Sequence, residues 1–565
     1  MKRTRYLSAL ISTLSLAVFA VSPAAAQIQV DSASPSAAPQ GTINLNVVIT
    51  GNGFKKGAVA QWFVTGTTNP GGVTVNSTTF KGSTQVTANI TVASDAVING
   101  FDIVVRNADG RTGKGTDRFA VTQKGTPVGC STTGTPSGFS LVTVLNPVQS
   151  DGTALIKSVY FGNAIRVRPI DLNRDGVVDS LLAFVTSGSG SGGTQGTYVF
   201  FLNPATGQIQ PSNPVTSAAW QNPLLLLTGV RATAAAAGDV NGDGIPDFAM
   251  AIPADARAYL FVGTVSASTL NPSYSVYPIQ PPLGAPTGWA QSVAMGDLDG
   301  DGNDEVLVGA FPGKRQASIP AVFIFKYAAG SLNYAQKIQD PPGTGEGFGG
   351  AIAVGNIDGA AGNELVVGAP GASTTNGGSV YVFPSPLQQS SFFSLTGPGP
   401  MFGRGLGIAD VNLDGSPDLA VITGDQFNGS DLTAKALLYT GAVHPGATFT
   451  NQLLPSSGNA YSFGAPNTDI GDMLAAGALL VGAPNSNNGS NCPNPPGSAQ
   501  LFTGPFSSTT GPNYLFEPPS LIGAYGNYGY GVAVAPGYPF ILIGEKLRDV
   551  GTTAQAGQVY VYMKN

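Results

Sequence analysis

The sequence predicts an all-β protein, with a β-sandwich followed by a seven-bladed β-propeller. The chain has 77 Gly and 42 Pro among 565 residues, a proportion typical of a protein with many tight turns. Only 10% of the residues are charged and 42% are hydrophobic, which argues against a disordered chain. Short apolar segments recur seven times with one outline over residues 138–565, and such a repeat indicates blades arranged around a ring.

Residues 1–26 are expected to be a signal peptide. Lys2 and Arg3 give a basic start, residues 7–21 are apolar, and small residues run up to Ala26. The apolar run is shorter than the roughly 20 residues that a membrane span needs. We therefore expect cleavage near Ala26, export to the extracellular space or the periplasm, and no membrane span.

Residues 27–123 are expected to form an immunoglobulin-like β-sandwich. Apolar and polar residues alternate over residues 43–49, 85–92 and 102–106, with Gly, Asn and Asp turns between them. The turn at residues 51–54 and the later segment FDIVVRNADG resemble the IPT/TIG family, whose modules are usually spacers or binding domains. The Gly-, Pro-, Thr- and Ser-rich residues 124–137 are expected to be a linker.

Residues 138–565 contain the seven repeats. Each has a small-residue strand, a loop that is acidic in most repeats, an apolar strand and then Gly-Ala-Pro or a variant. One such unit of four short strands cannot bury both faces of its sheet, whereas blades packed around a ring can. Their centres lie near Asp171, Asp239, Asp297, Asn356, Asp410, Ile470 and Val534.

The outline of these repeats resembles FG-GAP repeats, which form the blades of the integrin α-subunit propeller and occur in many bacterial secreted proteins. Phe348-Gly349 and Gly368-Ala369-Pro370 match the motif literally, as do Phe402-Gly403 and Gly482-Ala483-Pro484. The resemblance covers residues 138–565 and implies a propeller that serves in binding or adhesion.

The two ends of the propeller are expected to complete one blade together. After the seventh core repeat only one further strand, at residues 558–563, remains in the sequence, so the last sheet lacks its outer strand. The alternating segment Phe139–Leu145 is left unassigned before the first repeat. We expect it to pair with residues 559–562, because closure removes an exposed edge strand.

Four of the acidic loops carry oxygen-bearing side chains at positions 1, 3, 5 and 9, with Gly at position 6. Alternate residues direct several oxygens to one point, and position 7 can add its carbonyl. Hard oxygen donors in this number suit Ca²⁺ better than Zn²⁺. The predicted ligands are Asp171, Asn173, Asp175, Val177 and Asp179; Asp239, Asn241, Asp243, Ile245 and Asp247; Asp297, Asp299, Asp301, Asn303 and Glu305; and Asp410, Asn412, Asp414, Ser416 and Asp418.

A fifth loop, with Asn356, Asp358 and Glu364, is expected to be at most a weak site, because Ala360 stands at position 5. In the integrin-type propellers that these repeats resemble, such loops lie between the first two strands of a blade and hold Ca²⁺ structurally. The alternative is that all of these loops are acidic turns, since Asp, Asn and Gly favour turns in any case.

The two cysteines, Cys130 and Cys492, are expected to pair in an oxidising compartment. Two independent buried thiols are the alternative. The pairing would link the linker to the sixth repeat.

No catalytic constellation stands out in the sequence. His444, the single histidine, precedes Pro445 and is expected in an exposed turn. A net charge of −6 and a pI near 4.9 give no footprint for nucleic acid. We therefore expect a monomeric, non-catalytic module that binds Ca²⁺ and an unknown protein or carbohydrate ligand. The alternative is a secreted polysaccharide- or lipid-degrading enzyme, a class to which some propellers of this repeat type belong.

Overall fold

The structure of the protein is a computed structural model that describes most of residues 28–565. The exceptions are residues 40–41, 43, 94–95, 123–134, 147–159, 188–195, 287, 312–318, 342–346, 372–376, 399, 425–433, 456–468, 474–475, 485–496, 507, 519–527 and 547–556, together with the side chains of residues 469–473 and 476. The predicted signal peptide, Cys130 and Cys492 therefore lie outside the described residues.

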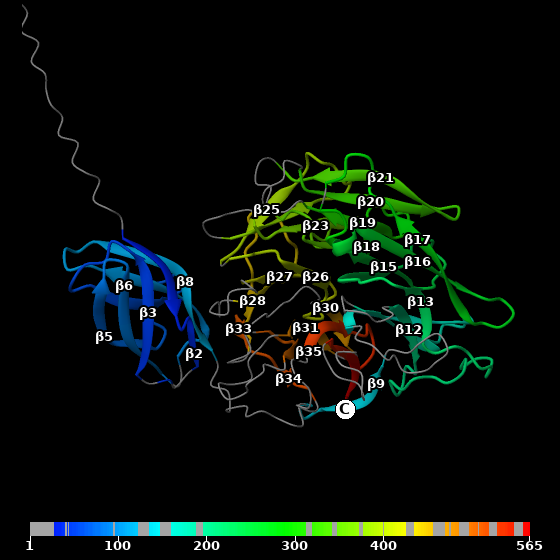
Figure 1. The fold of residues 1–565 in the computed structure, drawn as a ribbon, viewed down its shortest axis with the longest axis horizontal. Coiled ribbons are helices and arrows are strands. Elements are labelled where there is room, and N and C mark those ends of the chain that lie inside the picture. Colours follow the sequence, from blue (N-terminus) through cyan, green and yellow to red (C-terminus); the bar gives the residue numbers. More distant parts are fainter. Residues whose placement is uncertain are drawn as a thin grey trace, which may run out of the picture.

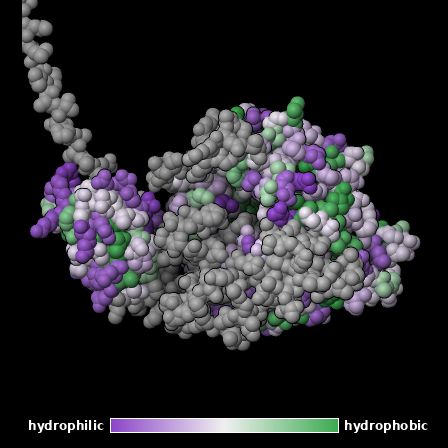
Figure 2. All heavy atoms as spheres, viewed as in Figure 1, coloured by the Kyte–Doolittle hydropathy of each residue, from purple (hydrophilic) through white to green (hydrophobic). Residues whose placement is uncertain are grey.

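The N-terminal part is a sandwich of two four-stranded sheets, with strand orders β1-β3-β6-β5 and β2-β8-β7-β4 (blue in Figure 1). Its strands are β1 Gln29–Ser34, β2 Ala37–Pro39, β3 Leu45–Asn52, β4 Val59–Val64, β5 Val73–Gly82, β6 Gln85–Val92, β7 Asn99–Arg106 and β8 Thr112–Thr122. Every second side chain of β6 is buried, because successive residues of a strand point to opposite faces. The buried side chains form one core, in which Trp62 meets Phe119 edge to face, while the visible outer surface is mostly hydrophilic (Figure 2).

The described part of residues 139–565 forms seven further sheets, six of four strands and one of five. The first four contain β10 Phe161–Ile170, β11 Ser180–Ser187, β12 Gly196–Leu202, β13 Leu224–Thr228; β14 Ala234–Gly238, β15 Asp247–Ile252, β16 Arg257–Val265, β17 Pro272–Ile279; β18 Ser292–Gly296, β19 Glu305–Ala310, β20 Ala321–Ala328, β21 Ser331–Gln339; and β22 Ala351–Gly355, β23 Glu364–Ala369, β24 Ser379–Phe383, β25 Phe393–Thr396.

The other three sheets contain β26 Gly405–Ala409, β27 Asp418–Thr423, β28 Lys435–Tyr439, β29 Asn451–Leu453, β33 Thr509–Thr510; β30 Asp469–Met473, β31 Ala476–Ala483, β32 Ser498–Thr503, β34 Tyr514–Phe516; and β35 Tyr528–Val534, β36 Phe540–Glu545, β37 Gln558–Lys564, β9 Phe139–Leu145. The one helix among the described residues is a single 3-10 turn, Pro253–Asp255.

The first strands of these sheets line the middle of a ring. Each contacts the first strand of the next sheet, from β10 through β14, β18, β22, β26 and β30 to β35, and β35 contacts β10 again. The second strands β11, β15, β19, β23, β27 and β36 are buried throughout, because a sheet covers each of their faces. Figure 1 shows the sheets following one another in chain order around this ring. The β-propeller expected from the repeats is confirmed.

The strand at the start of the propeller completes the last sheet. β9 pairs antiparallel with β37, and Val559 opposes Leu145 while Tyr562 opposes Leu141. Figure 1 places β9 beside the C-terminus. The expected pairing of Phe139–Leu145 with residues 559–562 is therefore confirmed.

The sandwich and the propeller are joined by a buried ion pair. Lys435, the first residue of β28, places Nζ 2.9 Å from Oδ2 of Asp117 in β8, and the two side chains are only 3% and 2% exposed. Asp117 is held by its own backbone N–H, which donates to Asp102. Breaking a buried pair leaves an uncompensated charge, which typically costs about 3–5 kcal/mol. Among the described helical residues, no stretch is long and apolar enough to cross a membrane.

Candidate metal centres

Each of the four predicted loops joins the first strand of a sheet to the second strand. The loops at residues 171–179, 239–247, 297–305 and 410–418 follow β10, β14, β18 and β26. The residue at position 2 turns inward in all four, and these side chains, Leu172, Val240, Leu298 and Val411, are buried. The loops are thereby fixed at the end of the first strands, where the chain leaves the middle of the ring.

One hydrogen-bond network shapes the loop at residues 239–247. The Gly244 N–H donates to Oδ2 of Asp239 at 2.7 Å, and the Asp243 N–H donates to Oδ1 of Asp239 at 3.2 Å. The Ile245 N–H donates to Asp243 at 2.8 Å, and the Val240 N–H donates to Asp247 at 2.8 Å. Backbone N–H groups of the loop therefore orient all three carboxylates.

The same four contacts recur in the other three loops. The donors at positions 6, 5, 7 and 2 are Gly176, Asp175, Val177 and Leu172; Gly302, Asp301, Asn303 and Leu298; and Gly415, Asp414, Ser416 and Val411. In every loop the N–H groups of positions 6 and 5 donate to the carboxylate at position 1, the N–H of position 7 donates to the carboxylate at position 5, and the N–H of position 2 donates to the carboxylate at position 9. The common register that the sequence indicates is therefore a common geometry.

Position 6 requires glycine in this geometry. Gly176, Gly244, Gly302 and Gly415 have φ between 77° and 89°, a region that L side chains rarely adopt. Position 4 also has positive φ, and there Arg174 and Leu413 accept it at 61° and 60° in two of the loops. These two loops thus hold some backbone strain at position 4, which the surrounding hydrogen bonds maintain.

Asp247 is the most deeply buried carboxylate of the loops. Its side chain is not exposed, and its Oδ1 accepts the Gly263 N–H at 2.7 Å. Burial raises the pKa of Asp247 to about 7, with a further contribution from the nearby carboxylates of Asp239 and Asp243. A buried carboxylate with like charges as neighbours is stabilised by a bound cation, so the donor set fits Ca²⁺ in this loop.

The loop at residues 297–305 differs, because a lysine of the same sheet lies in it. Lys326 of β20 contacts Asp299, and its Nζ lies 3.2 Å from both Oδ2 of Asp301 and Oε1 of Glu305. Oxygens of Asp297, Asp299 and Glu305 lie within 4.8 Å of one another, the one such acidic group among the described residues. Asp299, Asp301 and Glu305 raise the pKa of Lys326, so the ammonium already balances part of their charge.

An asparagine at position 3 distinguishes the other three loops from this one. Asn173, Asn241 and Asn412 each donate from Nδ2 to the carboxylate at position 5, at 2.9 to 3.2 Å. Their Oδ1 atoms accept the N–H of position 5. These loops therefore carry one negative charge fewer, and among the described residues none of their carboxylates forms an ion pair with a lysine.

The fifth loop keeps only part of the network. The Ile357 N–H donates to Glu364 at 2.8 Å, which matches the contact between positions 2 and 9 elsewhere. Ala360 has no carboxylate to accept the N–H of position 7, and its own N–H donates to Asp358 at 2.7 Å. The loop therefore lacks two of the three carboxylates that the other loops share, because Asn356 stands at position 1 and Ala360 at position 5.

Neighbouring loops are also linked to one another. The Asp239 N–H donates to Oδ2 of Asp304 in the next loop at 2.8 Å, and Asn363 donates to the Asp297 carbonyl at 2.6 Å. Arg174 donates to the Asp243 carbonyl at 2.8 Å. Asp304, Asn363, Arg174 and Lys326 were not predicted as part of the sites, because their contacts cross from one sheet or strand to another.

His444 lies in an exposed turn, as its neighbour Pro445 suggested, and its carbonyl accepts the Ala447 N–H at 2.9 Å. The histidine is therefore presented to solvent at the edge of the fifth sheet.

No family model matches the chain. One curated relative, integrin alpha-V of Gallus gallus, is 30% identical over 205 residues, which cover 33% of this chain. The chain spans only 19% of that relative's length. The solved structure of the Dos1 propeller has a TM-score of 0.39 at 10% identity and covers 75% of this chain and 95% of its own. A humanized mutant of the Chaetomium thermophilum Polycomb Repressive Complex 2 has the same TM-score at 8% identity, covering 75% of this chain and 97% of its own. The sequence similarity to integrin alpha-V supports a β-propeller, in agreement with the ring of sheets described above.

Proposed function

We propose that the chain is an exported, calcium-binding β-propeller that acts as a non-catalytic binding or adhesion module for a protein or glycan ligand. The observation that carries this proposal is the repetition of one oxygen-rich loop geometry at the same place in four sheets. An acidic turn needs no such repetition, whereas a set of structural cation sites does. The similarity to integrin alpha-V favours a role in binding.

The proposed ligands of each ion are the side chains at positions 1, 3, 5 and 9 and the carbonyl at position 7. Bound Ca²⁺ would supply positive charge where each loop gathers three or four carboxylates. The residues of this chain orient those oxygens through backbone N–H groups and bury one wall of the site. The role of the ions is structural, because each loop joins a strand that lines the middle of the ring to the buried second strand of the same sheet.

The domain organisation follows from this proposal. Residues 1–26 are a signal peptide, residues 27–123 an immunoglobulin-like module, residues 124–137 a linker and residues 138–565 the seven-bladed propeller. In this arrangement the sandwich holds the propeller away from a surface or offers a second binding face. The buried Lys435–Asp117 pair would keep the two parts in one orientation.

Two measurements test the proposal. Equilibrium dialysis of the purified chain against Ca²⁺ is expected to find about four bound ions, with Mg²⁺ competing poorly because it requires a stricter geometry. The chain is then applied to arrays of glycans and extracellular proteins in Ca²⁺ and in chelator. Absence of bound Ca²⁺ would contradict the metal sites, and turnover of a polysaccharide or lipid by the chain would contradict the non-catalytic role.

A further inference from the structure

A small cavity lies in the middle of the ring, at the mouth opposite the acidic loops. It has a volume of about 120 Å³ and is bounded by β10, β14, β18, β22 and β26. Residues at or just before the starts of β14, β18, β22 and β26 line it, whereas the loops follow the ends of the same strands. Five strand residues span roughly 16 Å, so the cavity and the loops are separate sites.

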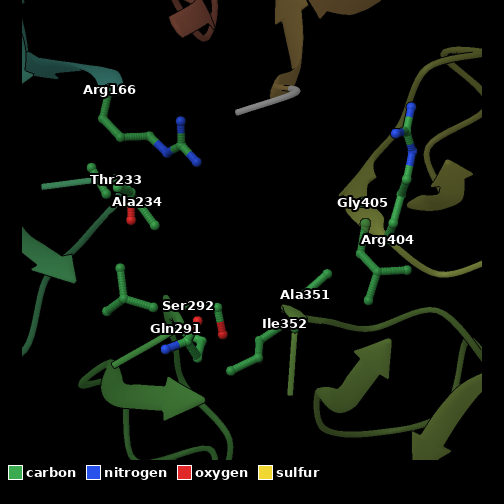
Figure 3. A pocket seen from close by; sticks show the side chains of 13 residues that line it. Arg166, Thr233, Ala234, Gln291, Ser292, Ala351, Ile352, Arg404 and Gly405 are labelled. Atoms are coloured by element: carbon green, nitrogen blue, oxygen red, sulfur yellow. The ribbon is translucent and has the colours of Figure 1, made fainter. Parts of the chain in front are cut away.

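Arg166 gives this cavity a positive charge. Arg166 of β10 and Arg404, directly before β26, line opposite sides of the hollow, and Figure 3 shows the Arg166 side chain extending into it while the Arg404 side chain runs away from it. No Asp or Glu occurs among the described residues that line the cavity. The side chains of β30, which carries Asp469 and Asp472, are outside the described set.

The guanidinium group of Arg166 has donors to offer a ligand. One of its nitrogens donates to the Ile165 carbonyl at 2.7 Å, and a guanidinium carries five N–H groups in all. The hydroxyl of Ser292 is committed differently, because it donates to the Gly349 carbonyl at 2.6 Å. Hydrogen-bond donors toward the hollow therefore come from Arg166 rather than from the hydroxyl of this serine.

The remaining walls of the cavity combine aliphatic groups with the polar side chains of Thr233, Gln291 and Ser292. Ala234, Ala351, Ile352 and Leu406 contribute aliphatic groups, and Gly350 and Gly405 contribute no side chain. The volume equals that of about four water molecules in the liquid. A ligand that fits must be small, and it must combine a negative group with a short apolar part.

We propose that this cavity binds a carboxylate group on a short aliphatic stem. Arginine binds the two oxygens of a carboxylate with two parallel N–H groups, which favours a planar carboxylate over a point-like anion. The stem would lie against Ile352 and Leu406. The carboxylate belongs either to a free aliphatic dicarboxylic acid or to a Glu side chain presented by a protein. This site is distinct from the proposed calcium loops, since none of their predicted ligands lines it.

Calorimetric titration of the full chain, saturated with Ca²⁺, tests this proposal with two carboxylate probes. Glutarate represents the free acid, and a Gly-rich peptide with one central Glu represents the protein-borne group. Glutaramide, the peptide with Gln in place of Glu, and inorganic phosphate are the comparisons. We expect at least one carboxylate probe to bind tenfold or more tightly than its amide counterpart and than phosphate. Binding of glutarate identifies the free acid as a source, and binding of the peptide alone identifies a protein.

Variants of Arg166 locate the site. Arg166→Gln is expected to weaken binding at least tenfold, and Arg166→Lys to weaken it less, since it keeps the charge but loses the planar fork. Lys337→Gln is the matched control, because it removes one positive charge from the exposed face of β21 and is expected to change nothing. Melting curves establish that each variant is folded, and Arg166→Lys serves if Arg166→Gln is not.

Three outcomes would overturn the proposal. These are no binding of either carboxylate probe, equal binding of phosphate, or unchanged carboxylate binding in Arg166→Gln. The calcium sites are tested separately with Asp243→Ala, which is expected to lose one bound ion and to retain carboxylate binding. Retained calcium binding together with no carboxylate binding would reject this site and leave the proposed metal centres standing.

Discussion

The loops at residues 239–247 and 297–305 have the same backbone network but balance their negative charge differently. In the first, Asp247 is fully buried and its pKa is raised to about 7, with no lysine or arginine side chain in an ion pair with it among the described residues. In the second, Lys326 contacts three carboxylates, and the pKa of Asp301 is lowered by Asn303 and by Lys326. The difference teaches that the loop geometry specifies a place for positive charge, which a side chain can fill in part and a metal ion can fill elsewhere.

Removal of metal is expected to have the largest effect on this comparison. A ligand present at about 100 times its Kd stabilises the folded state by about 3 kcal/mol at each site, so several sites lost together lower the melting temperature strongly. Differential scanning calorimetry in Ca²⁺ and in chelator measures this. Identical melting curves in the two solutions would mean that none of the loops binds Ca²⁺ in the folded chain.

The next largest effect is expected from pH in the metal-free chain. Because the pKa of Asp247 is raised in the folded state, the folded chain prefers the neutral acid, and stability falls as pH rises from about 4 through about 7. The full shift corresponds to at most about 4 kcal/mol. Asp247→Asn should therefore stabilise the chain at pH 8 in chelator and have little effect at pH 4.

The control for this pH effect lies in the other loop. The lowered pKa of Asp301 predicts the opposite sign, with stability lost as pH falls through the acidic range. Asp301→Asn should thus be destabilising near neutral pH in chelator. Chemical denaturation of both variants at pH 4 and pH 8 gives the four values needed, and the same sign for both variants would contradict the contrast between the loops.

A single carboxylate removed from the loop at residues 239–247 is expected to abolish one site. Asp243→Ala should cost about 3 kcal/mol at a Ca²⁺ concentration near 100 times Kd, and little in chelator. Asp358→Ala in the incomplete fifth loop is the matched substitution and should change calcium-dependent stability far less. Equal losses in the two variants would show that the fifth loop is a full site.

The smallest effect is expected from the lysine. Lys326→Met removes the ammonium that competes for the oxygens of Asp299, Asp301 and Glu305, so the loop at residues 297–305 should bind Ca²⁺ more tightly, by about tenfold. In chelator the same change should cost about 1 kcal/mol or less, since Lys326 is partly exposed. Calorimetric titration with Ca²⁺ compares the variant with Lys337→Met, and an unchanged affinity would mean that Lys326 leaves the loop when the ion binds.

Local patterns in the sequence predict much of the fold. The alternation in Phe139–Leu145 and the missing outer strand of the last repeat together predict that β9 closes the ring. The spacing of Asp239, Asp243, Gly244 and Asp247 predicts the loop geometry, because these residues are close in the chain and their hydrogen bonds are local.

Contacts that depend on cross-strand register were beyond sequence reasoning. Lys326 reaches Glu305 because Phe325 opposes Val306 in the pairing of β19 with β20, and nothing in the two segments reveals this register. Asp304 accepts a hydrogen bond from the backbone of Asp239, which belongs to the neighbouring sheet. Arg166 and Arg404 come from different repeats and line the same cavity only because the ring closes.

The closure of the ring by β9 also constrains the order of events during synthesis. β9 is made before the first sheet of the propeller, yet its partner β37 is made after the six other sheets. Throughout translation β9 therefore waits without its native neighbour, and a chain that stops short of residue 558 keeps that edge open. Proteases and chaperones that recognise an unpaired strand could thus distinguish a finished chain from a truncated one by this segment alone.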